Sequence, residues 1–232
     1  DPAVAALRRG AFVAVWAAKD VDGSGSGIVA QVFRRNGRPA GRLVQVNTHA
    51  GGNQTGPAVA SLPDGSFVVV WESARQDGSG KGIYAQAFAA SGRKRGREVL
   101  VNRTTARSQA SPAVAALGRK GFVVAWESQK QDGSGYGVFA RRLDKRGRPK
   151  GAEIALNVTT AGHQRAPSLA ALADGGFLAS WASLQQDGSG YGIFARRFDG
   201  RGEAAGAEFQ VNTTVANHQA EPSAAGFSGG GC

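Results

Sequence analysis

The stretch Gln131-Asp132-Gly133-Ser134-Gly135-Tyr136-Gly137 recurs along the chain and sets its organisation. Equivalent stretches begin at Gln186, at Gln76 and, in a weaker form, at Val21. Their aspartates follow one another at intervals of 55 residues and are Asp22, Asp77, Asp132 and Asp187. Self-similarity at a period of about this size is typical of propeller blades.

The period divides the chain into four repeats and the start of a fifth. The repeats span 1–55, 56–110, 111–165 and 166–220, and the partial fifth spans 221–227. We expect a single β-propeller domain over 1–227 and a glycine-rich tail over 228–232 that ends in Cys232, the one cysteine of the chain. A lone terminal thiol after glycines is typical of a linker or an attachment handle.

Each repeat contains the pattern of four short strands separated by turn residues. In the third repeat we expect strands at 112–117, 122–126, 137–143 and 153–156. The second strand is apolar at almost every position, which indicates that both of its faces are covered. The sequence therefore predicts an all-β fold, a four-bladed β-propeller built from four 55-residue, four-stranded repeats, with an open β-solenoid as the alternative.

The segment that follows the fourth repeat raises a question of closure. Glu221-Pro222-Ser223-Ala224-Ala225 begins the first strand again. Either this segment competes with the N-terminal strand for one place in the ring, or the chain is a piece of a longer array.

Basic residues gather in the turns that follow the first and third strands of each repeat, which we expect to share one face of the propeller. The net charge of the chain is +11. We interpret this basic patch as a surface for an anionic polymer or acidic partner, with a solvated rim as the alternative. Nucleic acid is not expected, because no aromatic residues interleave the arginines. The patch comprises Arg93, Lys94, Arg95, Arg97, Arg141, Arg142, Lys145, Arg146, Arg148 and Lys150.

The opposite face is expected to hold the Asp-Gly-Ser-Gly turns together with asparagines and glutamines. Side chains of these types usually bond to nearby backbone groups in tight turns. The functional alternative is weak multivalent glycan binding or weak Ca²⁺ binding through the aspartate turns. The candidate ligand-binding residues are Asp22, Asp77, Asp132, Asp187, Asn102, Asn157, Asn212, Gln109, Gln164 and Gln219.

We find no linear catalytic motif, and the sequence predicts neither an enzyme nor catalytic residues. Glu72 and Glu127 follow the tryptophan of the second strand, but Ala17 and Ala182 replace them in the outer repeats. A hydrolase with its site over the central channel is the least favoured hypothesis.

The run from Trp126 to Arg142 resembles a tandem repeat of large secreted bacterial proteins, which often also carry adhesin, cadherin-like or haemolysin-type calcium-binding segments. The runs 112–117 and 151–157 complete the same pattern, and the resemblance covers all four repeats. The first repeat departs most, at 17–21. The resemblance implies a secreted or cell-surface bacterial module, propeller-like, with no assigned reaction.

These observations give a functional hypothesis and one alternative. The hypothesis is a non-catalytic extracellular binding or structural module, of the kind used in adhesion, that presents its polar loops to a glycan, a surface or a protein partner. The alternative is a scaffold subunit of a larger assembly, docked through its basic face to acidic partners. No cofactor is expected apart from calcium, and no apolar run approaches the roughly 20 residues that cross a bilayer.

Overall fold

The computed structural model describes residues 2–226, and its regular structure is almost all β. The predicted tail over 228–232, with Cys232, lies outside the described residues. Two single-turn 3₁₀ segments, η1 (Arg8–Gly10) and η2 (Gly118–Lys120), lie between strands. Among residues 2–226 no helix is long and apolar enough to span a membrane.

The strands form four antiparallel sheets, each with its four strands in chain order. The first sheet holds β1 (Ala3–Ala6), β2 (Phe12–Lys19), β3 (Ser26–Phe33) and β4 (Val44–Gln45). The second holds β5 (Gln54–Ser61), β6 (Phe67–Ala74), β7 (Lys81–Phe88) and β8 (Lys94–Leu100). The third holds β9 (Gln109–Ala116), β10 (Phe122–Gln129), β11 (Tyr136–Leu143) and β12 (Pro149–Ala155). The fourth holds β13 (Gln164–Ala171), β14 (Phe177–Leu184), β15 (Tyr191–Phe198) and β16 (Phe209–Gln210).

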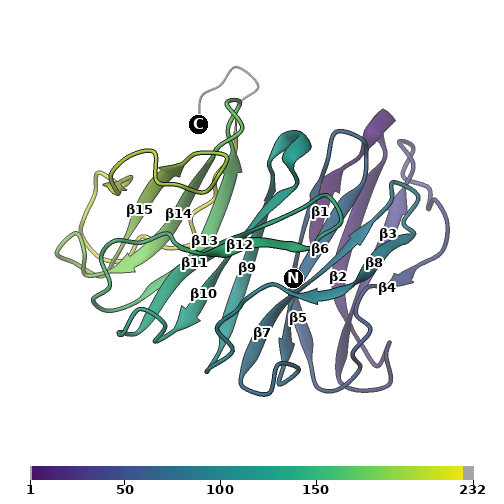
Figure 1. Cartoon of the computed structure of the whole chain (residues 1–232), viewed down its shortest axis with the longest axis horizontal. Coiled ribbons are helices and arrows are strands. Elements are labelled where there is room, and N and C mark those ends of the chain that lie inside the picture. Colours follow the sequence, from purple (N-terminus) through teal and green to yellow (C-terminus); the bar gives the residue numbers. More distant parts are fainter. Residues whose placement is uncertain (1, 227–232) are drawn as a thin grey trace.

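The four-bladed β-propeller predicted from the sequence is confirmed, with one sheet for each repeat. Figure 1 shows the sheets side by side, from β1–β4 in purple to β13–β16 in green and yellow. Neighbouring sheets pack through their first strands, β1 against β5, β5 against β9, and β9 against β13. We call these four the inner strands.

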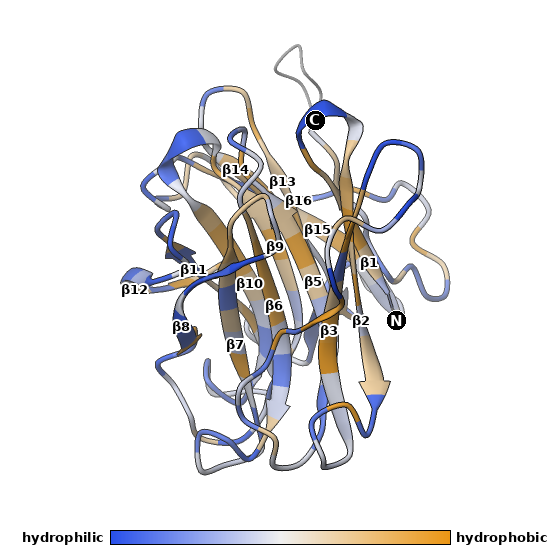
Figure 2. Cartoon of the chain, turned by 90° about the vertical axis from the view of Figure 1, so that its right-hand side faces the viewer, coloured by the Kyte–Doolittle hydropathy of each residue, from blue (hydrophilic) through white to orange (hydrophobic). Residues whose placement is uncertain are grey.

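The second strand of a blade is apolar on both faces because a sheet lies on each side of it. In β10, Val123 and Ala125 pack with Trp181 of the fourth sheet. Trp126, on the other face of the same strand, packs with Val70 of the second sheet. Figure 2 shows the same arrangement in colour, with hydrophobic strands in the middle of the molecule and hydrophilic turns at their ends. Each interface between sheets therefore has its own hydrophobic core.

The start of the fifth repeat occupies a place of its own. The backbone N–H of Ala224 donates to Ser168 Oγ of β13 at 2.9 Å. A cavity of about 730 Å³ lies between the C-terminal ends of the inner strands. One residue from the same repeat position in each repeat lines it. These residues are Ala6, Ser61, Ala116, Ala171 and Gly226. The segment before Gly226 therefore lies against β13 and does not displace β1.

The tryptophans of the second strands show how much burial a neighbouring sheet provides. Trp71, Trp126 and Trp181 are each 0% exposed, because the preceding sheet covers them. Trp16 holds the same repeat position in β2 but is partly exposed. Within residues 2–226, no sheet precedes the one to which Trp16 belongs.

This difference gives a test of the packing. We expect Trp126→Ala to lower the free energy of unfolding by roughly 3–5 kcal/mol, because it leaves a large cavity between two sheets. Trp16→Ala is the matched control and should cost clearly less. Urea denaturation followed by fluorescence of the remaining tryptophans measures both variants. Equal losses would contradict the account of burial between sheets.

Candidate functional site

Three of the four inner strands, β5, β9 and β13, begin irregularly, because a proline follows a residue with left-handed backbone. Strands β5, β9 and β13 each shift register at this point. Proline has no N–H to contribute to a ladder, so a bulge is the expected outcome. The four left-handed residues are Gly56 (φ 57°), Ser111 (φ 53°), Ala166 (φ 51°) and Glu221 (φ 56°). They all lie at the end of the inner strands that faces away from the 730 Å³ cavity.

A buried glutamate of the preceding sheet holds two of these bulges. The N–H of Ser111 donates to Glu72 Oε1 at 2.7 Å, and the N–H of Ala166 donates to Glu127 Oε2 at 3.2 Å. Glu72 is 7% exposed and Glu127 is 3% exposed. A non-glycine residue in this conformation costs about 1–3 kcal/mol, which such contacts offset.

At the junction between the first and second sheets, no glutamate within residues 2–226 holds the left-handed residue. Ala17 stands where the next two sheets have Glu72 and Glu127, and the left-handed residue after it is Gly56. Glycine adopts positive φ without a steric cost, so no carboxylate is needed there.

The two buried glutamates take their positive partners from different strands. Glu72 Oε2 lies 2.5 Å from Lys81 Nζ of β7, in an ion pair. Glu127 accepts from Arg165 of β13 at both oxygens, with distances of 3.0 and 3.3 Å. The guanidinium of Arg165 also lies over the ring of Tyr136, 4.5 Å from its centre. The hydrogen bond to Glu127 raises the pKa of Arg165, so this cation stays charged.

The junction between the third and fourth sheets contains a cavity of about 280 Å³. The fourth sheet has Ala182 in the place of a glutamate, and this small side chain lines the cavity together with Glu221, whose backbone is left-handed. Glu221 is exposed, in contrast to Glu127. We call this space the axial cavity. Its lining residues are Ser111, Glu127, Arg165, Ala166, Ala182, Tyr191, Ala220 and Glu221.

The axial cavity therefore brings together the groups that acid–base chemistry on a neutral ligand needs. Two carboxylates, Glu127 and Glu221, come from repeats that are far apart in sequence. One carboxylate is buried and bound by a guanidinium, and the other is exposed, so their environments differ. Tyr191 adds an aromatic side chain with a hydroxyl group.

The candidate aspartates of the Asp-Gly-Ser-Gly turns have intramolecular partners. The Oδ1 of Asp132 accepts the N–H of Ser134 at 3.3 Å, and the other three turns have the same contact. Gly137 passes so close to Asp132 that an added Cβ would collide with the carboxylate. The last glycine of this motif thus allows the close approach of the turn to its own strand.

The candidate asparagines and glutamines form polar clusters, two of which link one sheet to the next, because Gln109 and Gln164 begin β9 and β13. Asn157 Oδ1 accepts the N–H of Val138 at 2.9 Å, and Asn157 Nδ2 donates to Gln164 Oε1 at 3.4 Å and to Asp132 Oδ2 at 3.3 Å. Asn102 with Gln109 and Asn212 with Gln219 make the equivalent pairs. None of the ten candidate residues lines the axial cavity. Ligand binding by them stays a prediction.

The basic patch and the calcium hypothesis also stay predictions. Three members of the patch bond within the protein, since Arg141 donates to Val101 O, Arg142 to Gly200 O, and Arg148 pairs with Asp144. Across residues 2–226 no group of three or more His, Cys, Asp or Glu side chains is placed to hold a metal ion.

Comparisons with known proteins give matches in structure alone. No protein-family model matches the chain, and no curated protein matches its sequence. The α-L-arabinanase of Penicillium chrysogenum, solved with arabinobiose, matches with a TM-score of 0.69 at 14% identity, over 97% of this chain and 70% of that one. The α-L-arabinofuranosidase of Fusarium graminearum, from family GH93 and also solved with arabinobiose, matches with a TM-score of 0.62 at 12% identity, over 90% and 65%. The Bacillus subtilis arabinanase matches with a TM-score of 0.51 at 15% identity, over 97% and 84%.

These neighbours contradict the sequence-based prediction of a non-catalytic module, and we correct it. The propellers that this chain is similar to are glycoside hydrolases, whereas the sequence predicted an adhesion-type binding or structural protein and no enzyme. The scaffold alternative is set aside with it. The physical reason is that side chains from separate repeats come to line one cavity only through packing, so no short motif in the sequence marks such a cavity. The signal that could have located Glu127 and Glu221 is the replacement of glutamate by Ala182 at one junction.

The contact between glutamate and bulge can be tested by exchanging one junction for another. We expect Glu72→Ala to lower the free energy of unfolding by roughly 1–3 kcal/mol, because the N–H of Ser111 loses its acceptor. Adding Ser111→Gly should recover part of this loss, as the pair Ala17 and Gly56 indicates. Ala115→Gly, in a regular part of β9, is the control and should lower stability further. Urea denaturation measures the free energy of unfolding of each variant. Equal losses of stability on adding Ser111→Gly and on adding Ala115→Gly would contradict the role of Glu72 at this bulge.

Proposed function

We propose that this chain is a glycoside hydrolase module that acts on a glycan of arabinose residues, with its site in the axial cavity. The observation that carries the proposal is that Glu127 and Glu221 line one cavity of about 280 Å³. Glycoside hydrolysis is performed by a pair of carboxyl groups that flank the scissile bond. Similar propellers that are themselves an arabinanase and an arabinofuranosidase, both solved with arabinobiose, support the choice of sugar.

The different surroundings of the two carboxylates suit different roles. Glu127 is buried and fixed by Arg165 and the N–H of Ala166, so it supplies a fixed negative charge beside the anomeric carbon. That charge stabilises the oxocarbenium-like transition state. Glu221 is exposed at the rim and can exchange protons with a substrate oxygen or with water.

In the proposed reaction, the proton that Glu221 donates is replaced by a proton from water. Glu221 donates a proton to the glycosidic oxygen as the bond to the anomeric carbon breaks, and the leaving sugar departs with a hydroxyl group. Water then bonds to the anomeric carbon and returns a proton to Glu221. Glu127 remains an anion throughout and changes no bonds.

The size and lining of the axial cavity fit a short piece of glycan. Its volume lies near the lower end of the roughly 300–1,000 Å³ that small-molecule sites occupy. Tyr191 offers an aromatic face to the C–H groups of a sugar ring and a hydroxyl to its oxygens. A polymeric substrate also agrees with the secreted or cell-surface location predicted from the sequence, and the proposed partner is a glycan.

The activity test uses linear arabinan and an aryl α-L-arabinofuranoside as substrates. We expect release of reducing sugar or of the aryl alcohol by the unchanged chain. Glu221→Gln should lower kcat/KM by at least about 100-fold, because it removes the proton donor while the exposed site keeps its shape. Glu127→Gln should cause a loss of similar size.

Glu72→Gln is the matched control, because Glu72 holds the same repeat position as Glu127 but does not line the axial cavity. Its activity should stay within about twofold of the unchanged chain, a difference below 1 kcal/mol in the barrier. Absence of any turnover by the unchanged chain, or an equal loss in Glu72→Gln and Glu221→Gln, would rule out the proposed site.

A further inference from the structure

A further cavity, at the opposite end of the inner strands from the axial cavity, is lined by three cationic side chains and one aspartate. It has a volume of about 260 Å³ and lies among turns of the first three sheets. The turns are η1 after β1, the connection after β5, η2 after β9, and the connection after β11. The lining residues that matter are Arg8, Leu62, Pro63, Asp64, Arg119 and Lys145. We call it the cationic cavity.

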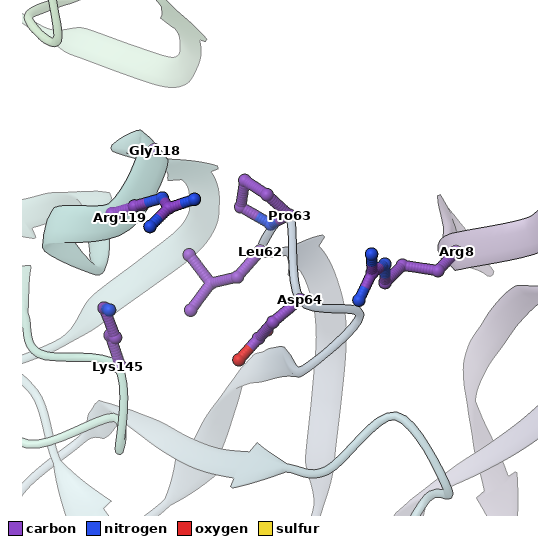
Figure 3. A pocket seen from close by; sticks show the side chains of 7 residues that line it. All are labelled: Arg8, Leu62, Pro63, Asp64, Gly118, Arg119 and Lys145. Atoms are coloured by element: carbon purple, nitrogen blue, oxygen red, sulfur yellow. The ribbon is translucent and has the colours of Figure 1, made fainter.

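Figure 3 shows how the charged side chains approach the cationic cavity. Arg8 reaches in from one side, and Arg119 and Lys145 reach in from the other, with Leu62 and Pro63 between them. Within residues 2–226 no ion pair includes Arg8, Arg119 or Lys145. Three cations thus surround one space without a carboxylate bound to any of them.

Asp64 does not neutralise this set of charges. Its Oδ1 accepts the N–H of Ser66 at 2.9 Å and the hydroxyl of the same serine. These hydrogen bonds, together with the positive charges of Arg95 and Lys145, hold the pKa of Asp64 below its usual value. The carboxylate is therefore ionised at neutral pH, and three positive charges face one negative charge.

The cationic cavity is not a by-product of the repeat. Four charged residues line the cavity, and the positions one repeat further along the chain are equivalent to them. Those equivalent positions hold Pro63, Arg119, Asp174 and Gly200. Asp174 pairs there with Arg197 at 2.5 Å. The four equivalent positions at the neighbouring junction therefore hold one positive and one negative charge, whereas the cationic cavity has three positive charges and one negative charge.

We propose that the cationic cavity binds a compact oxyanion, such as the sulfate, phosphate or carboxylate group of a ligand. Arginine presents several N–H donors in a plane that matches two oxygens of such a group, and lysine adds a point charge. Leu62, which is buried, and Pro63, which is exposed, form an apolar part of the lining. Of the ten residues of the basic patch, Lys145 alone lines this cavity.

The proposed oxyanion site is separate from the axial cavity. The axial cavity lies at the start of the inner strands, whereas Arg8, Asp64 and Arg119 follow their ends. Loss of the oxyanion site should therefore leave binding at Glu127 and Glu221 intact, and the two proposals can fail independently.

The test is isothermal titration calorimetry of the full chain at low ionic strength. Inorganic sulfate, inorganic phosphate and glucuronate are titrated in separate experiments. We expect saturable binding of one anion per chain. Arg119→Gln and Lys145→Gln should each weaken it by about tenfold or more, because each removes a charged hydrogen-bond donor. Tighter binding of glucuronate would assign the oxyanion to a glycan, and tighter binding of sulfate or phosphate would assign it to a free ion; both results support the site.

Arg9→Gln and Lys120→Gln are the matched controls. Arg9 and Lys120 lie in η1 and η2 beside Arg8 and Arg119, but neither lines the cavity. Their affinities should stay within about twofold of the unchanged chain, since screening weakens the effect of exposed charges outside the site. The proposal is overturned if no anion saturates the chain, or if all four variants lose affinity equally.

Discussion

No sheet in this protein can cover its own two apolar faces, and this constraint governs the rest of the structure. Strands such as β6 and β10 are buried along almost their whole length, so each needs a sheet on both sides. Burial of apolar surface contributes roughly 25 cal/mol per Å², which makes the packing of sheet on sheet the main stabilising term. Placing the sheets side by side around an axis gives the second and third sheets a neighbour on each side and brings the starts of the inner strands together.

The sites arise where the repeats differ from one another. Glu127 and Arg165 hold one bulge, and the next junction, with Ala182, leaves the axial cavity open beside Glu221. The cationic cavity follows the same principle, because its charges are not repeated at the neighbouring junction. The repeated residues maintain the fold, and both proposed sites are lined by residues that depart from the repeat.

The fold could be predicted from the sequence because its period and strand patterns are local. The strand expected at 122–126 is observed as β10, and the one expected at 137–143 is observed as β11, each within a few residues. The expected strand at 153–156 begins earlier, at Pro149, because β12 continues across a shift in register.

The candidate site could not be found in the same way. Glu127 and Glu221 line one cavity through the packing of distant segments, a relation that no spacing along the chain expresses. The repeated Asp, Asn and Gln residues are regular along the chain, yet their side chains bond to one another, within a sheet or from one sheet to the next. Regularity in a repeat protein reports on the common structure of the blades, so it directed the sequence analysis toward a binding module and away from an enzyme.

A crystal structure of the chain with a disaccharide of the proposed substrate would test the central claim most directly. The account predicts a sugar in the axial cavity, against Tyr191, with its glycosidic oxygen within about 2.6–3.2 Å of Glu221. A sugar bound instead to the Asp-Gly-Ser-Gly turns, with the axial cavity empty, would contradict it.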